Sequence, residues 1–199
     1  NEKGEPVLNE KGELVCSSPF PSMPISFWND ENGEKYFNAY FNKFKNTWAH
    51  GDFIEINDHG GVVIYGRSDA TLNPGGVRIG TAEIYRIVES LPEVDDSLVI
   101  GQEWNNDQRI ILFLKLKKTK ELTNKLSDVI KQTIKTSLSP RHVPSLIFQV
   151  EDIPYTISGK KVELAVKKII EGDNVVNQDA LSNPESLDLY RSIPELSSR

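Results

Sequence analysis

The stretch Ile110-Ile-Leu-Phe-Leu-Lys-Leu116 is apolar except for one lysine, as is typical of a buried strand. After a short polar connection, apolar side chains recur at helical spacing, at Leu122, Leu126, Val129, Ile130, Ile134 and Leu138. A helix with such a stripe buries one face against a neighbouring layer. The strand and the helix therefore predict a domain in which helices cover a small sheet.

The same alternation continues in both directions from this centre. A predicted helix over residues 84–91 and a strand over 97–100 precede it, and a strand over 146–150 and a helix over 162–170 follow it. Because every helix carries an apolar stripe, every helix can bury one face on the sheet. The predicted fold class is therefore α+β, with a small mixed sheet and packed helices.

The first third of the chain has a different pattern of apolar and polar residues. Residues 53–56 and 62–65 alternate as strands on either side of the turn signal Asn57-Asp-His-Gly-Gly61, which predicts a hairpin. The aromatic residues between Trp28 and Trp48 recur at i, i+4 spacing, which favours a helix. This region lacks enough periodic structure for a core of its own.

These sequence patterns predict that the chain has three parts. Residues 1–68 are expected to be the β-rich end of a larger, incomplete N-terminal domain. Residues 69–174 are expected to form a small C-terminal domain, and residues 175–199 a C-terminal tail. The chain is thus expected to be the C-terminal part of a longer one.

Composition excludes several classes of function. With 23 basic and 29 acidic residues the net charge is −6, which repels nucleic acid and anionic membranes. No apolar stretch approaches the ~20 residues of a membrane helix. The single cysteine, Cys16, indicates a reducing compartment, and His50, His59 and His142 are too far apart for a metal-ligand pattern. We expect no nucleic acid, membrane or metal site, and a cytosolic location.

The first candidate site lies at the ends of the predicted hairpin. Asp52 precedes the first strand and Arg67 follows the second, so the hairpin can bring a carboxylate and a guanidinium together. A carboxylate accepts hydrogen bonds only, which suits a pair of sugar hydroxyls. A plain cross-strand ion pair explains the same pattern.

The second candidate site is the glycine-rich stretch that surrounds Arg78. Gly75, Gly76 and Gly80 allow a ligand to approach the backbone, and Arg78 offers forked donors to a phosphate. Thr81 can cap the helix that follows. The stretch matches neither a Walker loop nor a dinucleotide fingerprint, and a turn with a solvent-facing arginine is the alternative.

The third candidate is Lys160, in Pro154-Tyr-Thr-Ile-Ser-Gly-Lys-Lys161. A lysine on a turn of small residues at the mouth of a helix can swing a point charge into a neighbouring site. A lysine in an ordinary surface turn is the alternative.

Together these stretches resemble a known superfamily. The motifs are Trp48-Ala-His-Gly-Asp52, Gly66-Arg-Ser-Asp69, Gly76-Val-Arg-Ile79 with Glu83-Ile84, and Ser158-Gly-Lys160. In order and spacing they resemble the late core motifs of the adenylate-forming enzymes. From about Gly12 to the C-terminus, further stretches resemble the acetoacetyl-CoA synthetase family within it, among them Ser18–Pro24, Phe27–Asp30, Ala70–Pro74, Arg141–Pro144, Ile153–Ile157 and Asn183–Tyr190.

The resemblance implies an ATP-dependent, AMP-forming acid–CoA ligase that converts acetoacetate, ATP and coenzyme A to acetoacetyl-CoA, AMP and pyrophosphate. Magnesium accompanies ATP and is held mainly by residues outside this chain, as is the acid. The partners implied are these small molecules and the missing N-terminal domain. The chain by itself is expected to be inactive. A small-molecule-binding or regulatory α+β module without catalysis remains the alternative, as does a partner-binding role for residues 28–48.

The resemblance also assigns roles to single residues. Asp52 and Arg67 would hold the ribose hydroxyls of ATP, and Arg78 a phosphate. Lys160 would be the lysine of the adenylation step. Asp69 would be the hinge of the small domain.

Two further residues would meet coenzyme A. Gly76 would form a wall of the pantetheine tunnel, and Lys135 aligns with a coenzyme A contact. The chain departs from the usual pattern in two places, since Glu163 replaces a basic residue and Lys161 doubles the lysine. The choice of Lys160 therefore rests on its spacing from Gly159.

Overall fold

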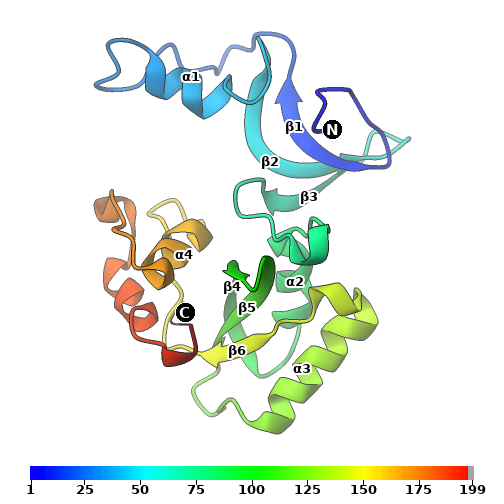
Figure 1. The fold of residues 1–199 in the computed structure, drawn as a ribbon, viewed down its shortest axis with the longest axis vertical. Coiled ribbons are helices and arrows are strands. Elements are labelled where there is room, and N and C mark those ends of the chain that lie inside the picture. Colours follow the sequence, from blue (N-terminus) through cyan, green and yellow to red (C-terminus); the bar gives the residue numbers. More distant parts are fainter. Residues whose placement is uncertain (197–199) are drawn as a thin grey trace. The chain divides into compact units, whose positions relative to one another are not determined.

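A computed structural model describes residues 1–196 of the protein (Figure 1). The chain divides into two compact units, Asn1–Asp69 and a second that begins at Ala70. Within residues 1–196, no helix combines the length and the apolar character that a membrane crossing needs. The expected three-part division stays a prediction.

The first unit is a three-stranded antiparallel sheet, β1 (Lys11–Cys16), β2 (Trp48–Ile56) and β3 (Val62–Arg67), in that order. The expected hairpin is present as β2 and β3. The helix expected between residues 28 and 48 is much shorter, α1 (Glu34–Tyr40). Its aromatic side chains gather instead around Trp48, on which the Tyr40 ring stacks at 3.6 Å.

The second unit holds a mixed sheet in the order β4 (Val94–Trp104), β5 (Asp107–Leu116) and β6 (Leu146–Gln149). The β4–β5 pair is antiparallel and the β5–β6 pair is parallel. The α-helices are α2 (Thr81–Val88), α3 (Asn124–Ser137) and α4 (Glu163–Glu171). The predicted α+β fold class is therefore confirmed.

Side chains along β4 and β5 point alternately to the two faces of the sheet, so the core of this unit has two layers. Val99, Leu112 and Leu114 pack with residues of α2 and α3 on one face. Leu98, Ile111 and Phe113, which point the other way because side chains alternate along a strand, pack with α4. This explains why residues 110–114 are apolar without a break.

Short 3-10 turns complete the second unit. They are η1 (Pro74–Gly76), η2 (Pro140–His142), η3 (Gln178–Ala180), η4 (Pro184–Tyr190) and η5 (Pro194–Leu196). The last three turns fold back onto the layer that contains α4, where Tyr190 is only 1% exposed. The residues after 174 therefore contribute to the core.

Candidate functional site

The β2–β3 hairpin brings Asp52 and Arg67 together. They are register partners, and the Arg67 Nη1 lies 3.5 Å from the Asp52 Oδ1. The Arg67 Nη1 also donates to the carbonyl oxygen of His50 at 3.1 Å. The cross-strand ion pair is thus present, while the Asp52 side chain stays 25% exposed and its carboxylate can still accept from a ligand.

Gly51 makes room for this arrangement. Its φ of +85° is a left-handed conformation, and a Cβ on it would lie 2.5 Å from the Arg67 Nη2. Glycine is the residue that allows both the backbone conformation and the close approach. Gly51, which leaves room, and Asp52, which supplies the opposite charge, therefore together position the Arg67 guanidinium.

Arg67 also contacts Asp69, with Nη2 and Oδ2 3.3 Å apart. Partial burial opposes the charge, but the hydrogen bond and charge of Asp69, with Asp52 and Glu13 further off, raise the pKa of the Arg67 guanidinium. Arg67 is therefore a fixed cation held between carboxylates. The first unit thus gathers Asp52, Arg67 and Asp69 at one end of its hairpin.

In the second unit, the glycine-rich loop is held by the tip of the β4–β5 hairpin. The backbone N–H of Gly75 donates to the Asp107 carboxylate at 2.8 Å, and that of Asn73 to the Gln108 side chain at 2.7 Å. Hydrogen bonds from the N–H groups of Gln108 and Gly75 lower the pKa of Asp107. Neither Asp107 nor Gln108 was expected from the sequence, because both are remote from the loop along the chain.

The conformation of this loop requires its glycines. Gly75 and Gly76 have φ values of +58° and +76°. A Cβ on Gly75 would lie 2.5 Å from the Nη1 of Arg141, which donates to the Gly75 carbonyl oxygen, whereas nothing lies within 4 Å of a Cβ on Gly76. Gly76 therefore faces open space, and Arg78 follows it in the same loop, partly buried.

The cap of α2 differs from expectation. The N-cap is Gly80 and not Thr81, which is the first helical residue and 3% exposed. The Glu83 carboxylate instead accepts from the Gly80 N–H at 2.8 Å. The prediction that Thr81 caps the helix is therefore wrong, because the chain enters the helix one residue earlier.

Lys160 lies in a tight turn between the bridge partners Tyr155 and Lys161. Its N–H donates to the Thr156 hydroxyl at 3.0 Å, and its carbonyl oxygen accepts from the Thr156 N–H at 2.8 Å. Within residues 1–196 the Lys160 ammonium has no hydrogen bond or ion pair, and the residue is exposed. The turn therefore presents a free positive charge on a fixed backbone.

The C-terminal segment braces the other side of this turn. The Ile157 N–H donates to the Ala180 carbonyl oxygen at 2.9 Å, and the Ser182 N–H donates to the Tyr155 carbonyl oxygen at 2.9 Å. The Asn183 side chain accepts from the Tyr155 N–H at 2.9 Å. Sequence reasoning missed this brace, because residues 175–196 show no periodic pattern.

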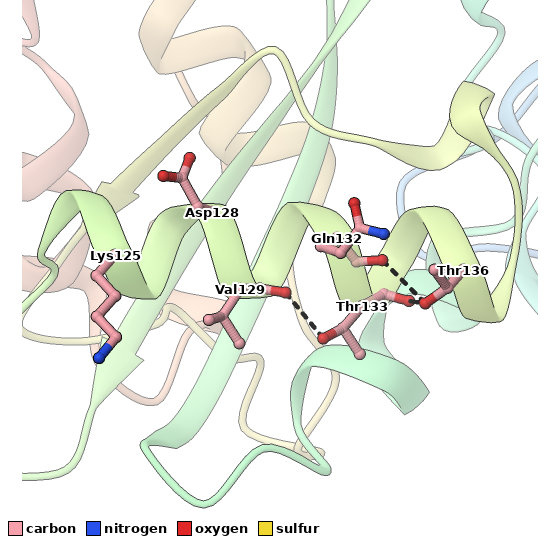
Figure 2. Close-up of a pocket in the computed structure, with 6 residues that line it drawn as sticks. All are labelled: Lys125, Asp128, Val129, Gln132, Thr133 and Thr136. Atoms are coloured by element: carbon pink, nitrogen blue, oxygen red, sulfur yellow. Dashed lines mark hydrogen bonds between the residues drawn. The ribbon is translucent and has the colours of Figure 1, made fainter.

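Lys135 is exposed in the last turn of α3. A shallow depression of about 560 Å³ on the same helix is lined by Lys125, Asp128, Val129, Gln132, Thr133 and Thr136 (Figure 2). The hydroxyls of Thr133 and Thr136 are occupied by backbone carbonyl oxygens of Val129 and Gln132. Lys135 is not among the lining residues.

The site residues of the second unit thus stand on three elements: the glycine-rich loop, the end of α3 and the Lys160 turn. Among residues 1–196, no cluster of three or more histidine, cysteine, aspartate or glutamate side chains could hold a metal ion. The roles assigned to the individual residues stay predictions.

Comparison with known proteins finds one matching family model and several similar proteins. Residues 83–160 match the AMP-binding enzyme C-terminal domain. The chain is 58% identical over 198 residues to the acetoacetyl-coenzyme A synthetase of Rhizobium meliloti, and 59% to that of Xenopus tropicalis, covering 100% and 98% of this chain. The acetoacetyl-CoA synthetase structure from Streptomyces lividans superimposes with a TM-score of 0.90 and 44% identity over 99% of this chain. The chain spans about 30% of the length of each of these proteins.

Proposed function

We propose that this chain, which belongs to the adenylate-forming AMP-binding enzymes, is the C-terminal part of an acetoacetate–CoA ligase. The complete enzyme would convert acetoacetate, ATP and coenzyme A to acetoacetyl-CoA, AMP and pyrophosphate. What carries the proposal is that the likeness to acetoacetyl-CoA synthetases runs the length of the chain. The exposed Lys160 ammonium and the Asp52–Arg67 pair supply chemistry that suits this reaction.

The first step joins two anions. A carboxylate oxygen attacks the α-phosphorus of ATP, the new O–P bond forms, and pyrophosphate leaves. Two unit charges near contact repel by about 4 kcal/mol in a partly desolvated site, and a cation between them offsets much of this. Lys160 suits this role because its ammonium is free and its backbone is held on both sides.

The nucleotide itself would be held by fixed charges. The Asp52 carboxylate would accept from the ribose hydroxyls, with Arg67 holding it in place from 3.5 Å. Arg78 would contact a phosphate from the glycine-rich loop. Mg²⁺ would accompany ATP and would be held mainly by residues outside this chain.

The second step needs the same space for a thiol. The sulfur of coenzyme A attacks the acyl carbonyl carbon, and AMP leaves with the electron pair of the broken C–O bond. The Gly76 backbone would line the path of the pantetheine arm, and Lys135 would contact coenzyme A. Asp69 would be the hinge about which the small domain turns between the two steps. The enzyme would act in the cytosol.

The direct test is the stoichiometry of the complete enzyme. The protein is incubated with acetoacetate, ATP, Mg²⁺ and coenzyme A, and thioester, AMP and pyrophosphate are quantified together. The proposal expects equal amounts of the three. Formation of ADP and phosphate, or no nucleotide cleavage with any short carboxylic acid, would contradict it. Acetate and 3-hydroxybutyrate serve as comparison acids.

A second experiment uses residues 1–199 alone. Because the acid pocket and the triphosphate contacts would lie outside the chain, the proposal expects no thioester from this polypeptide. Measurable acetoacetyl-CoA formation by it would require a second active site.

A further inference from the structure

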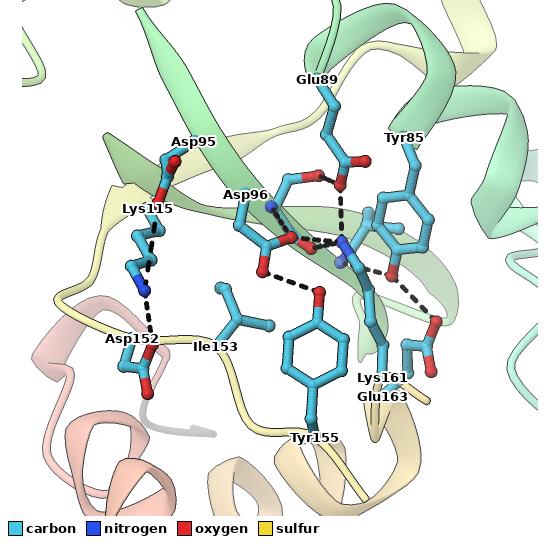
Figure 3. Close-up of polar contacts among 12 residues, drawn as sticks. Tyr85, Glu89, Asp95, Asp96, Lys115, Asp152, Ile153, Tyr155, Lys161 and Glu163 are labelled. Carbon is cyan, nitrogen blue, oxygen red and sulfur yellow. Dashed lines mark hydrogen bonds and ion pairs between the residues drawn. The ribbon is translucent and has the colours of Figure 1, made fainter. Parts of the chain in front are cut away.

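The residue after Lys160 is the most heavily engaged lysine of the second unit. Lys161 Nζ donates to the Glu89 carboxylate at 2.5 Å, to the Asp96 carboxylate at 2.6 Å and to the Ser97 carbonyl oxygen at 2.5 Å (Figure 3). An ammonium has three protons, so these acceptors use all of its donors. Its side chain is only 16% exposed.

The surroundings of this ammonium are built from separate elements. Glu89 ends α2, Asp96 lies on β4, and the Tyr85 ring of α2 lies 4.3 Å from the nitrogen. The Tyr155 hydroxyl donates to the second oxygen of Asp96 at 2.7 Å. The two sides of the Lys160 turn, Tyr155 and Lys161, are thus tied to the same carboxylate of the central sheet.

Lys160 differs from Lys161 both in its exposure and in the partners of its ammonium. It is exposed, and its ammonium has no partner in the described part of the chain. The Lys161 side chain is largely buried against α2 and β4, whereas its neighbour Lys160 is exposed. Their Cα atoms are only about 3.8 Å apart, so a shift of one moves the other.

We propose that Lys161 is the positioning residue of the Lys160 turn. Its ammonium locks the turn to α2 and β4 and so sets the place of the Lys160 charge, without touching the reactants. The inference rests on the proposed role of Lys160 in adenylation. Because a misplacement of about 1 Å can lower a rate by about a hundredfold, such an anchor matters for the chemical step.

The anchor also neutralises its own acceptors. Without the Lys161 charge, the carboxylates of Glu89 and Asp96 would face each other in a partly buried space with no cation between them. The turn would also lose its ion pairs to α2 and β4. Because Lys161 and Tyr155 both bond Asp96, a substitution at Asp96, which is remote from Lys160 along the chain, should loosen the turn as well.

The test compares three variants of the complete enzyme. Lys161→Met removes the anchor, Asp96→Asn weakens it from the other end, and Lys118→Met is the control. Lys118 is exposed, and the structure assigns its side chain no partner among residues 1–196. For each variant, kcat and KM are measured in acetoacetate-dependent ATP–pyrophosphate exchange, and thiolysis is measured with supplied acyl-adenylate.

We expect Lys161→Met and Asp96→Asn to lower kcat of exchange by about ten- to a hundredfold, with KM for ATP and the thiolysis rate changed by less than about twofold. Lys118→Met should match the unsubstituted enzyme. Normal exchange in the Lys161 variant would overturn the inference. So would a loss in that variant with normal exchange in Asp96→Asn, since Lys161 would then act on the reactants itself. If Lys161→Met fails to fold, Asp96→Asn still decides.

A second measurement is independent of catalysis. Trace acetylation of the native complete enzyme, read by mass spectrometry, compares the reactivity of the two amines. We expect Lys160 to be acetylated at least about tenfold faster than Lys161. Asp96→Asn should lower this ratio of the two rates, because Lys161 becomes more accessible. Equal reactivity in the unsubstituted enzyme would overturn the anchor. If Lys160→Ala leaves exchange unchanged, the proposed function fails while this ratio still tests the anchor.

Discussion

The β2–β3 hairpin and the Lys160 turn hold their charges in opposite ways. In the hairpin, Arg67 lies 3.5 Å from Asp52 and 3.3 Å from Asp69, so the site residues fix one another directly. In the turn, Lys160 is unpaired among residues 1–196, and its neighbour Lys161 carries the ion pairs. The two regions show two ways to fix the position of a charge. A charged side chain that would contact one ligand group can be held by direct ion pairs, as Arg67 is. A charged side chain that would enter and leave a site can be positioned through its backbone instead, as Lys160 is.

Apart from Lys160 itself, the largest effect that would test this contrast is at Asp69. In the complete enzyme, we expect Asp69→Pro to keep pyrophosphate exchange and to lower thioester formation by about two orders of magnitude, because a fixed φ blocks rotation of the small domain. Asp69→Ala is the matched control, since it removes the contact with Arg67 without fixing φ. A melting curve controls for stability. Unimpaired thioester formation would place the hinge elsewhere.

The next effect tests the hairpin. Arg67→Ala should raise KM for ATP by about ten- to a hundredfold, since a charged hydrogen bond is worth roughly 1.5–3 kcal/mol and Asp52 loses its guanidinium partner. Initial rates at varied ATP measure this. Arg67→Lys, which keeps the charge but not the fork, should recover part of the affinity. An unchanged KM in both variants would reduce the pair to a structural contact.

A smaller effect is expected at the loop that carries Gly76. Asp107→Ala removes the acceptor of the Gly75 N–H and should raise KM for coenzyme A by about three- to tenfold, with pyrophosphate exchange unchanged. Gln108→Ala, which removes the neighbouring acceptor of Asn73, should act in the same direction. A rise in KM for ATP instead would show that the loop serves the nucleotide.

The smallest effect concerns stability at high pH. Burial, together with the hydrogen bond and charge of Asp96, raises the pKa of the Tyr155 hydroxyl above its ordinary value. The folded state therefore keeps a proton that the unfolded chain loses above about pH 10, so stability falls as pH rises. Tyr155→Phe should make the fall of Tm between about pH 9 and 11 shallower. Because burial raises the pKa of Tyr85 and Tyr190 as well, some slope should remain, and an unchanged slope would contradict the assignment.

Local patterns predicted the second unit well. The apolar run at 110–116 and the stripe at 122–138 correspond to β5 and α3, because burial on a sheet imposes these periods directly. The long aromatic helix expected near residues 28–48 was wrong for a related reason. The rings pack around Trp48 in three dimensions, and only residues 34–40 remain helical.

The contacts that hold the candidate site residues in place could not be predicted from the sequence. Lys161 meets Glu89 and Asp96 across 72 and 65 residues, and Asn183 reaches Tyr155 across 28. Such pairs form because strands and turns bring remote segments together, and no local period marks them. The candidate charges themselves were found because they lie in short, ordered motifs.

The proposed adenylation step depends most on Lys160. The most direct measurement compares the two half-reactions of Lys160→Ala in the complete enzyme, acetoacetate-dependent pyrophosphate exchange and thiolysis of supplied acyl-adenylate. We predict that exchange falls by about a thousandfold or more while thiolysis changes by less than about twofold, because the ammonium stabilises only the first transition state. An equal loss in both half-reactions, or exchange at the unsubstituted rate, would contradict the account.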